Sequence, residues 1–169
     1  MYKPKRFSRK LYILTTVLLL IAFVLTGCSG IRTGTEAPNF TLSDLDGNQV
    51  TLSDLRGKNV FLNFWTTWCE HCVVEMPDIE QIHQEFQNKD LVVLTVNTGE
   101  DIETIRKYME EEGYTFTVLL DSGLDTARLY KVSEIPASYF INNEGIVVSK
   151  KVGEMTKAEM LEEIEKLYQ

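Results

Sequence analysis

The chain has few cysteines and, outside its first 30 residues, few basic residues. All five charged residues within positions 1–30 are Lys or Arg, which leaves 12 basic residues against 25 acidic ones and a net charge of −13 for the rest of the chain. A nucleic acid needs Lys and Arg side chains facing its phosphates, so no nucleic-acid partner is expected. The same deficit excludes electrostatic attachment of the remaining chain to an anionic membrane surface.

The sequence also lacks an apolar run of ordinary membrane-spanning length. Residues 11–25 are almost entirely apolar, which is about 15 residues where a spanning helix needs roughly 20. The basic region at 1–10 followed by this short run is the layout of a secretory signal. Leu25-Thr26-Gly27-Cys28 comes next and resembles the lipobox of bacterial lipoproteins, which implies cleavage before Cys28 and lipid on Cys28. An uncleaved signal anchor is the alternative, and both place the following domain outside the cytoplasmic membrane.

Three cysteines are an odd number, and an odd thiol in an exported protein needs an explanation. Lipid on Cys28 removes one thiol and leaves Cys69 and Cys72 as a pair. Residues 29–36 are rich in Gly, Ser and Thr, which is typical of a flexible tether. We therefore expect a lipoprotein signal peptide at 1–27, a lipidated Cys and tether at 28–36, and one folded domain at 37–169.

Segments with strand and helix patterns alternate along this domain. Strands are expected at 40–42, 50–52, 60–65, 91–96, 115–120, 138–141 and 146–152. A helical turn is expected at 53–57, and helices at 69–87, 101–112, 124–130 and from Thr156 onward, where Thr156 and Glu159 form a capping box. The alternation predicts an α/β fold whose central sheet is partly parallel, and the last two strands form a hairpin that makes the sheet mixed.

The motif Trp68-Cys69-Glu70-His71-Cys72 follows a buried strand and begins a helix. Two Cys three residues apart at a helix start lie close enough to form a disulfide. Cys69 occupies the helix N-terminus, where unpaired N–H groups and the helix dipole stabilise a thiolate. The thiolate is the nucleophile of disulfide exchange. Cys72 lies one turn inward and suits the resolving role.

Two further side chains have the right spacing to act on these thiols. His71, as an imidazolium, would lower the pKa of Cys69, and a solvated loop residue is the alternative. Glu75 follows Cys72 by three residues on the same helix face, where a carboxyl can move a proton to or from a buried thiol. An ordinary exposed helix Glu is the alternative, and the spacing alone favours neither. Pro136 precedes a strand, where a proline is normally a plain boundary residue.

With these motifs, residues 37–169 resemble the extracytoplasmic thioredoxin-like proteins of the TlpA/ResA type, within the AhpC/TSA–redoxin superfamily. The resemblance rests on residues 37–42, 46–47, 52–58, 64–69, 75–77, 96–97, 135–136 and 143–145. It implies a thioredoxin fold with an N-terminal β-hairpin and an inserted strand–helix element. By position, it makes Cys69 the attacking thiol, Cys72 the resolving thiol and Glu75 the acidic residue beside the active site.

The resemblance also implies a substrate-binding surface. Pro136 matches a cis-proline whose loop, with Ile135, faces the disulfide and helps to hold the substrate polypeptide. Trp68 matches a tryptophan packed beside the first thiol. One departure lies here, because Ala137 and Ser138 stand where threonines are common.

The second departure is His71, which stands where ResA-type members usually have proline. A reductase is the first hypothesis: it would take electrons from a membrane thiol donor of the CcdA/DsbD kind and reduce exported proteins, such as apocytochrome c or another redox enzyme. His71 resembles instead the oxidising DsbA-type site, because a more stable Cys69 thiolate makes the disulfide more oxidising. A disulfide-inserting oxidase is therefore the alternative. No cofactor is expected, and a monomer is the expected state.

Two other chemistries fit the sequence less well. Cys69, His71 and Cys72 are possible metal ligands, but the only other histidine is His83, more than two helical turns away, so no metal site is expected. A peroxidase of a related fold would have proline at the position of Leu62.

Overall fold

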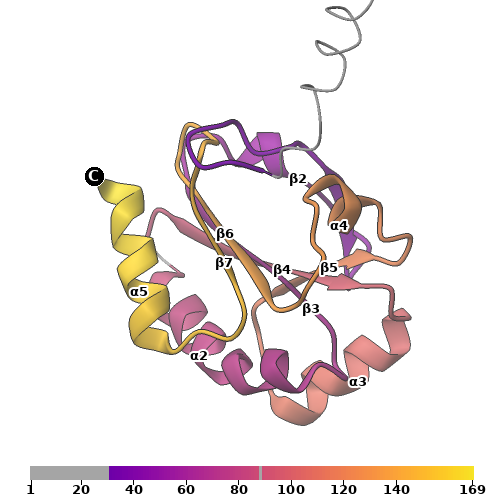
Figure 1. The fold of residues 1–169 in the computed structure, drawn as a ribbon. Helices are drawn as coiled ribbons and strands as arrows, with labels where there is room; N and C mark the ends of the chain where they lie inside the picture. The colour runs from indigo at the N-terminus through magenta and orange to yellow at the C-terminus, as the bar shows by residue number, and fades with distance from the viewer. Residues whose placement is uncertain (1–30, 88) are drawn as a thin grey trace, which may run out of the picture. The chain divides into compact units, whose positions relative to one another are not determined.

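The computed structural model describes residues 31–87 and 89–169, so the predicted signal peptide and Cys28 lie outside the described residues. Seven strands form one sheet in the order β2-β1-β5-β4-β3-β6-β7 (Figure 1). The strands are β1 (Thr41–Asp44), β2 (Gln49–Thr51), β3 (Asn59–Trp65), β4 (Leu91–Thr98), β5 (Thr117–Asp121), β6 (Ala137–Ile141) and β7 (Val147–Val152). The helices are η1 (Leu52–Leu55), α2 (Glu70–Phe86), α3 (Ile102–Glu112), α4 (Asp125–Leu129), α5 (Lys157–Glu165) and η2 (Lys166–Tyr168).

The centre of the sheet is parallel and its edges are antiparallel. Strands β3, β4 and β5 run parallel, while β6 pairs with β3, β7 with β6, and β1 with both β2 and β5 in the antiparallel sense. The mixed α/β sheet predicted from the alternating pattern is therefore confirmed. The β1–β2 hairpin and the β5–α4 strand–helix element are both present, as the resemblance implied.

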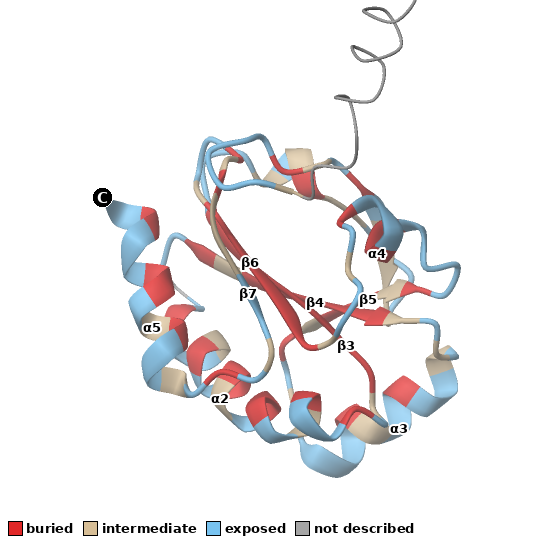
Figure 2. Cartoon of the chain, in the orientation of Figure 1, coloured by how far each residue is buried: buried red, intermediate tan, exposed pale blue. Residues whose placement is uncertain are grey.

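Helices cover both faces of the sheet, and each face has its own apolar core (Figures 1 and 2). The helices α2, α3 and α5 pack on one face, where Phe61 and Trp65 of β3 point toward them. The helix α4 and the segment before β1 cover the other face, where Leu62 and Phe64 of the same strand are buried. All seven residues of β3 are buried, because both faces of a central strand are covered. This strand is the rigid base on which α2 begins.

Two boundaries differ from the sequence prediction for identifiable reasons. Strand β5 begins at Thr117 rather than at 115, because the N–H groups of Thr115 and Phe116 donate to the Glu80 carboxylate of α2 at 2.8 and 3.2 Å. Strand β1 begins and ends later than predicted and reaches Asp44, whose carboxylate accepts the N–H groups of the following turn.

The N-terminal segment contacts the domain earlier than predicted. The tether was expected to run to residue 36, but Gly34 N–H donates to the Val147 carbonyl at 2.8 Å and Glu36 forms a β-bridge with Ile146. Contacts with the domain therefore begin at least three residues before residue 37. No helix within 31–87 and 89–169 has the length and apolar character that crossing a membrane would require.

The attachment of α2 to the strand β5 generates a stability prediction. Glu80→Ala should lower the free energy of unfolding by about 2 kcal/mol, because the Thr115 and Phe116 N–H groups lose their acceptor in a largely buried site. Denaturant titration measures this difference. Glu85→Ala is the matched control on the same helix, since Glu85 pairs with Lys89 in solvent at 3.8 Å, and it should change the stability by less than about 0.5 kcal/mol. Equal effects of the two substitutions would contradict the prediction.

Candidate active site

Cys69 and Cys72 form a disulfide at the N-terminus of α2, with their Cα atoms 5.2 Å apart. Cys69 is the N-cap residue, and its sulfur accepts the Cys72 N–H at 3.2 Å. The exposed fraction is 7% for Cys69 and 0% for Cys72. The outer sulfur is therefore the one that a partner can reach. It also lies where the helix dipole and the unpaired N–H groups of the first turn stabilise a thiolate.

The loop before β6 faces this disulfide. The Ile135–Pro136 peptide bond is cis, as the resemblance implied. Pro136 is buried, and the Ile135 carbonyl oxygen lies 3.8 Å from the Cys69 sulfur. A disulfide sulfur carries no hydrogen, so this distance is a contact in the oxidised state. After reduction, the same oxygen is an acceptor within reach of the Cys69 thiol.

Trp68 lies at the surface immediately before Cys69, and 73% of it is exposed. Val74, on the first turns of α2, is also an exposed apolar side chain. Exposed apolar groups beside a reactive centre are typical of a surface that contacts a partner. Trp68 is therefore placed to meet whatever molecule reaches Cys69.

A carboxylate that the sequence analysis did not single out holds the loop before Cys69. Glu100 accepts the Thr67 N–H at 2.7 Å and the Thr67 hydroxyl at 2.5 Å, and it also accepts from the Asn97 amide at 2.7 Å. Glu100 follows β4, which runs parallel to β3, so both strands deliver their C-terminal ends to the same edge of the sheet. That topology was the signal that could have identified Glu100.

Glu75 lies three residues after Cys72 on α2 and is fully buried, with 0% of it exposed, so the alternative of an exposed helix Glu does not hold. Its Oε1 accepts from the Asn63 amide at 2.7 Å, and its Oε2 accepts from the Met155 N–H at 3.1 Å. Burial penalises the charged form and raises the pKa of Glu75 to about 7, although these two hydrogen bonds favour the carboxylate. A carboxyl with such a pKa can both accept and release a proton near neutrality.

His71 lies on the surface, with 76% of its side chain exposed. Its Nδ1 lies 3.0 Å from Oε2 of Glu154, in the loop between β7 and α5. The hydrogen bond with Glu154 raises the pKa of His71, and the charges of Glu154 and Glu70 add to this effect. The negative charges of Glu154 and Glu70 therefore favour the imidazolium and offset part of its charge. Glu154 was not predicted from the sequence.

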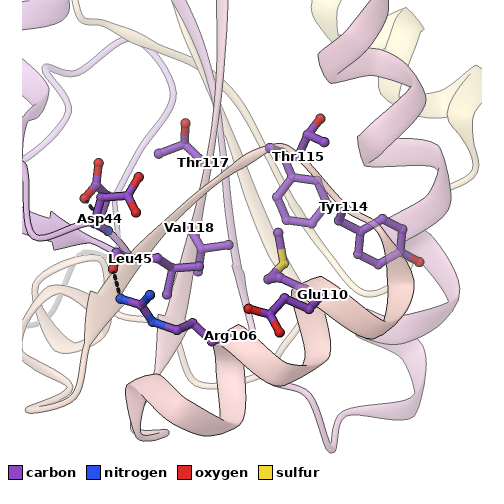
Figure 3. Close-up of a pocket in the computed structure, with 11 residues that line it drawn as sticks. Asp44, Leu45, Arg106, Glu110, Tyr114, Thr115, Thr117 and Val118 are labelled. Carbon is purple, nitrogen blue, oxygen red and sulfur yellow. Dashed lines mark hydrogen bonds between the residues drawn. The ribbon is translucent and has the colours of Figure 1, made fainter.

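The described ranges contain no group of three or more His, Cys, Asp or Glu side chains arranged to hold a metal ion. A cavity of about 330 Å³ lies between the end of β1, α3 and the segment entering β5. Figure 3 shows the residues that line it. There Arg106 donates to the Leu45 carbonyl. The cavity includes the start of β5, whereas the disulfide follows the end of the parallel strand β3. None of the disulfide-site residues lines the cavity.

Comparison with known proteins agrees with this geometry. Residues 33–150 match the model of the AhpC/TSA family. The chain is 38% identical over 160 residues to the thiol-disulfide oxidoreductase ResA of Bacillus subtilis, covering 89% of each chain. It is 34% identical over 172 aligned positions to ResA of Halalkalibacterium halodurans, covering 99% of this chain and 97% of the relative.

A solved structure extends the likeness to three dimensions. The crystal structure of the pneumococcal exposed lipoprotein thioredoxin of Streptococcus pneumoniae superimposes with a TM-score of 0.69 at 34% identity, covering 77% of this chain and 100% of that one. The thioredoxin-like fold implied by the motifs is confirmed. The chain belongs to the AhpC/TSA family and, within it, to the ResA-like thiol–disulfide oxidoreductases.

Proposed function

We propose that this protein is a lipid-anchored extracytoplasmic reductase of disulfides in exported proteins. The observation that carries the proposal is the Cys69–Cys72 disulfide at the N-terminus of α2, in which Cys69 keeps 7% of its surface exposed and Cys72 none. That asymmetry supports Cys69 as the attacking thiol and Cys72 as the resolving thiol. The disulfide corresponds to the state reached after one round of substrate reduction.

The reaction cycle begins from the dithiol. The Cys69 thiolate attacks one sulfur of the substrate disulfide, a Cys69–substrate bond forms, and the other substrate sulfur leaves as a thiolate that takes up a proton. The Cys72 thiol loses its proton, and its sulfur attacks Cys69. The substrate then leaves with both thiols reduced, and the protein keeps the Cys69–Cys72 disulfide. A membrane thiol donor of the CcdA/DsbD kind returns two electrons and two protons.

Glu75 is the proposed proton carrier for Cys72. The resolving thiol is buried and must lose its proton to attack, while water has little access to it. Glu75 lies three residues further along α2, is itself buried, and has a pKa of about 7. It can therefore take the Cys72 proton during resolution and return it when the donor reduces the disulfide.

The charges around His71 support the reducing direction over the oxidising one. A free imidazolium beside Cys69 would stabilise its thiolate and make the disulfide more oxidising. Glu154 pairs with His71, so its negative charge offsets that stabilisation. The disulfide-inserting oxidase, for which His71 was the only motive, is the second candidate.

The surface beside Cys69 supports a protein as substrate. Trp68 is exposed on one side of the disulfide, and the Ile135–Pro136 loop faces it on another. We assign both to binding the substrate polypeptide, with apocytochrome c or another exported redox enzyme as the target class. Localisation rests on the sequence of residues 1–28, supported by the pneumococcal relative, which is described as an exposed lipoprotein. We expect a monomer.

Cysteine substitutions test the assignment of the two thiols. Cys72→Ser should accumulate a covalent mixed disulfide with a disulfide-bearing protein, because Cys69 still attacks and nothing resolves the bond. Cys69→Ser should form none. Non-reducing electrophoresis with mass spectrometry of the adduct measures both. Cys28→Ser is the control, and it should keep full exchange activity while losing the lipid mass. Adducts on Cys72 in the Cys69→Ser variant would reverse the assignment.

The raised pKa of Glu75 predicts a pH profile. The rate of mixed-disulfide resolution should rise through a midpoint near pH 7 in the wild type, because only the carboxylate accepts the Cys72 proton. Glu75→Gln should slow resolution about 100-fold at pH 8 and remove that midpoint. Stopped-flow kinetics measures the step. Glu70→Gln, inside the motif and exposed, should leave the profile unchanged. An unaltered profile in Glu75→Gln would rule out Glu75 as the proton carrier.

The stability of the oxidised protein gives an independent check on the same group. Because burial raises the folded-state pKa to about 7 from 4.5, the folded state binds more protons between these values. The contribution of this proton uptake by Glu75 to the free energy of unfolding is complete below pH 4.5 and is lost as the pH rises through 7. Relative to Glu75→Gln, the wild type should lose about 3 kcal/mol of unfolding free energy between pH 4 and pH 8.

The reduction potential of the Cys69–Cys72 pair decides between the two directions. A value near about −270 mV supports the reductase, and one near about −120 mV supports the oxidase. His71→Pro should lower the potential by about 30 mV, because the positive charge near Cys69 is lost. His83→Gln is the control with the other histidine and should not move it. Equilibration with glutathione or dithiothreitol provides the measurement, and a potential unmoved by His71→Pro would remove the motive for the oxidase.

A further inference from the structure

Asn63 is a polar side chain in the middle of β3, where no surface is exposed. Its neighbours in register are Thr95 on β4 and Ser138 on β6. A buried amide costs stability unless its hydrogen-bonding groups find partners. Asn63 lies on the face of β3 that α2 covers, and its partners there include Glu75.

The amide of Asn63 uses only its donor side. Nδ2 donates to Oε1 of Glu75 at 2.7 Å and to Oγ of Ser138 at 3.0 Å. Among the described residues, Oδ1 of Asn63 is buried and has no hydrogen-bond partner. This orientation suits a Glu75 carboxylate, which accepts hydrogen bonds and donates none.

The second oxygen of Glu75 determines where a proton can go. Oε2 accepts from the Met155 N–H at 3.1 Å, and a backbone N–H can only donate. A protonated Glu75 therefore keeps Oε2 as its carbonyl oxygen and carries the hydrogen on Oε1. In the present orientation of Asn63, that O–H would meet an N–H, and two donors would face each other in a dry interior.

We propose that Asn63 is a positioning residue that rotates its side-chain amide to match the protonation state of Glu75. This rests on the proposed role of Glu75 as proton carrier. Rotation exchanges Nδ2 and Oδ1, so Oδ1 accepts from the protonated Oε1 of Glu75. The Ser138 hydroxyl, which is both donor and acceptor, turns to donate to the same Oδ1.

Two features allow the rotation. The terminal torsion of an Asn side chain has a broad, roughly two-fold energy profile. No donor within the described residues holds Oδ1 in place, so both hydrogen bonds that the rotation breaks are replaced. Its cost is that the Nδ2 hydrogens turn toward the side of the amide where Oδ1 has no partner. The amide therefore offers a partner to both forms of the carboxyl, and neither form carries an unmet donor toward Asn63.

The charged groups near Glu75 do not provide this matching. Asp78 lies on the same helix and Glu154 in the β7–α5 loop, and both carboxylates disfavour the ionised Glu75. Cys72, on the first turn of α2, is the thiol with which Glu75 exchanges its proton. From β3 and β6, the groups that take part are the neutral Asn63 and Ser138.

Nuclear magnetic resonance of the oxidised full-length protein in detergent micelles tests the rotation directly. Above the midpoint of the Glu75 carboxyl titration, nuclear Overhauser effects should connect the Asn63 amide protons with the Glu75 side chain, and they should be lost below it. Asn59 is the matched control, since it is buried on the same strand with an unpartnered Oδ1, and its amide should not respond. Amide contacts of Asn63 that stay constant while Glu75 titrates would overturn the proposal.

The Asn63→Leu variant gives a kinetic test. If the amide serves both forms of Glu75, Asn63→Leu should slow mixed-disulfide resolution about tenfold on both sides of the midpoint, with Asn59→Leu within twofold of the wild type. If Asn63 only donates to the carboxylate, the midpoint should move upward while the rate at low pH stays at the wild-type value, and the proposal fails.

These outcomes are separable from failure of the proposed function. The resonance experiment uses the wild type without substrate, so it decides the rotation even if Asn63→Leu does not fold. A rotating amide combined with a Glu75→Gln variant of unchanged kinetics would reject the proton carrier and keep the rotation. A fixed Asn63 amide combined with slow resolution in Glu75→Gln would reject the rotation and keep Glu75 as the proton carrier.

Discussion

The active site depends on one constraint, which is that only four residues separate the end of the fully buried central strand β3 from the start of α2. The strand is held on both sides by β4 and β6, so the position of its last residue is set by the whole sheet. Cys69 becomes the N-cap of α2, and its sulfur accepts an N–H of the first turn. The same helix then buries Cys72 and Glu75 against the sheet. Reactivity at Cys69 and protection of Cys72 are therefore two results of a single packing arrangement.

Burying Glu75 opposes folding whenever the carboxyl is charged, and the surrounding structure offsets this only in part. Two hydrogen bonds reach its oxygens, from Asn63 on β3 and Met155 before α5, yet the pKa still rises to about 7. Glu80, one turn and a half further along α2, shows the contrasting case. Four donors meet its carboxylate, and these hydrogen bonds outweigh burial and lower its pKa. The larger number of donors and the slightly greater exposure of Glu80 both favour its charged form relative to that of Glu75.

Local sequence patterns predicted the elements well and the contacts between distant elements poorly. The strand before Cys69 and the helix after it follow from a short apolar run and a 3.6-residue period, which are local properties. Whether Glu75 is buried was not predictable, because spacing assigns a helix face without saying what covers it. Glu154 and Glu100 contact His71 and Thr67 across 83 and 33 residues, and no local pattern links such pairs. The start of β5 differs from the prediction for the same reason, since Glu80 accepts the N–H groups of Thr115 and Phe116, the two residues before the strand.

The pairing of His71 with Glu154 shows why a motif cannot be interpreted without its tertiary neighbours. Within the motif alone, histidine in place of proline implies a more stable Cys69 thiolate and a more oxidising disulfide. In the folded protein the imidazole lies against a carboxylate from another loop, and Met155, the next residue of that loop, donates to Glu75. One loop therefore contacts both His71 and Glu75, the two side chains for which we propose roles beside the thiols. Under the proposed function, the reduction potential therefore depends on that loop and α2 together, because each contributes one charge to the His71–Glu154 pair.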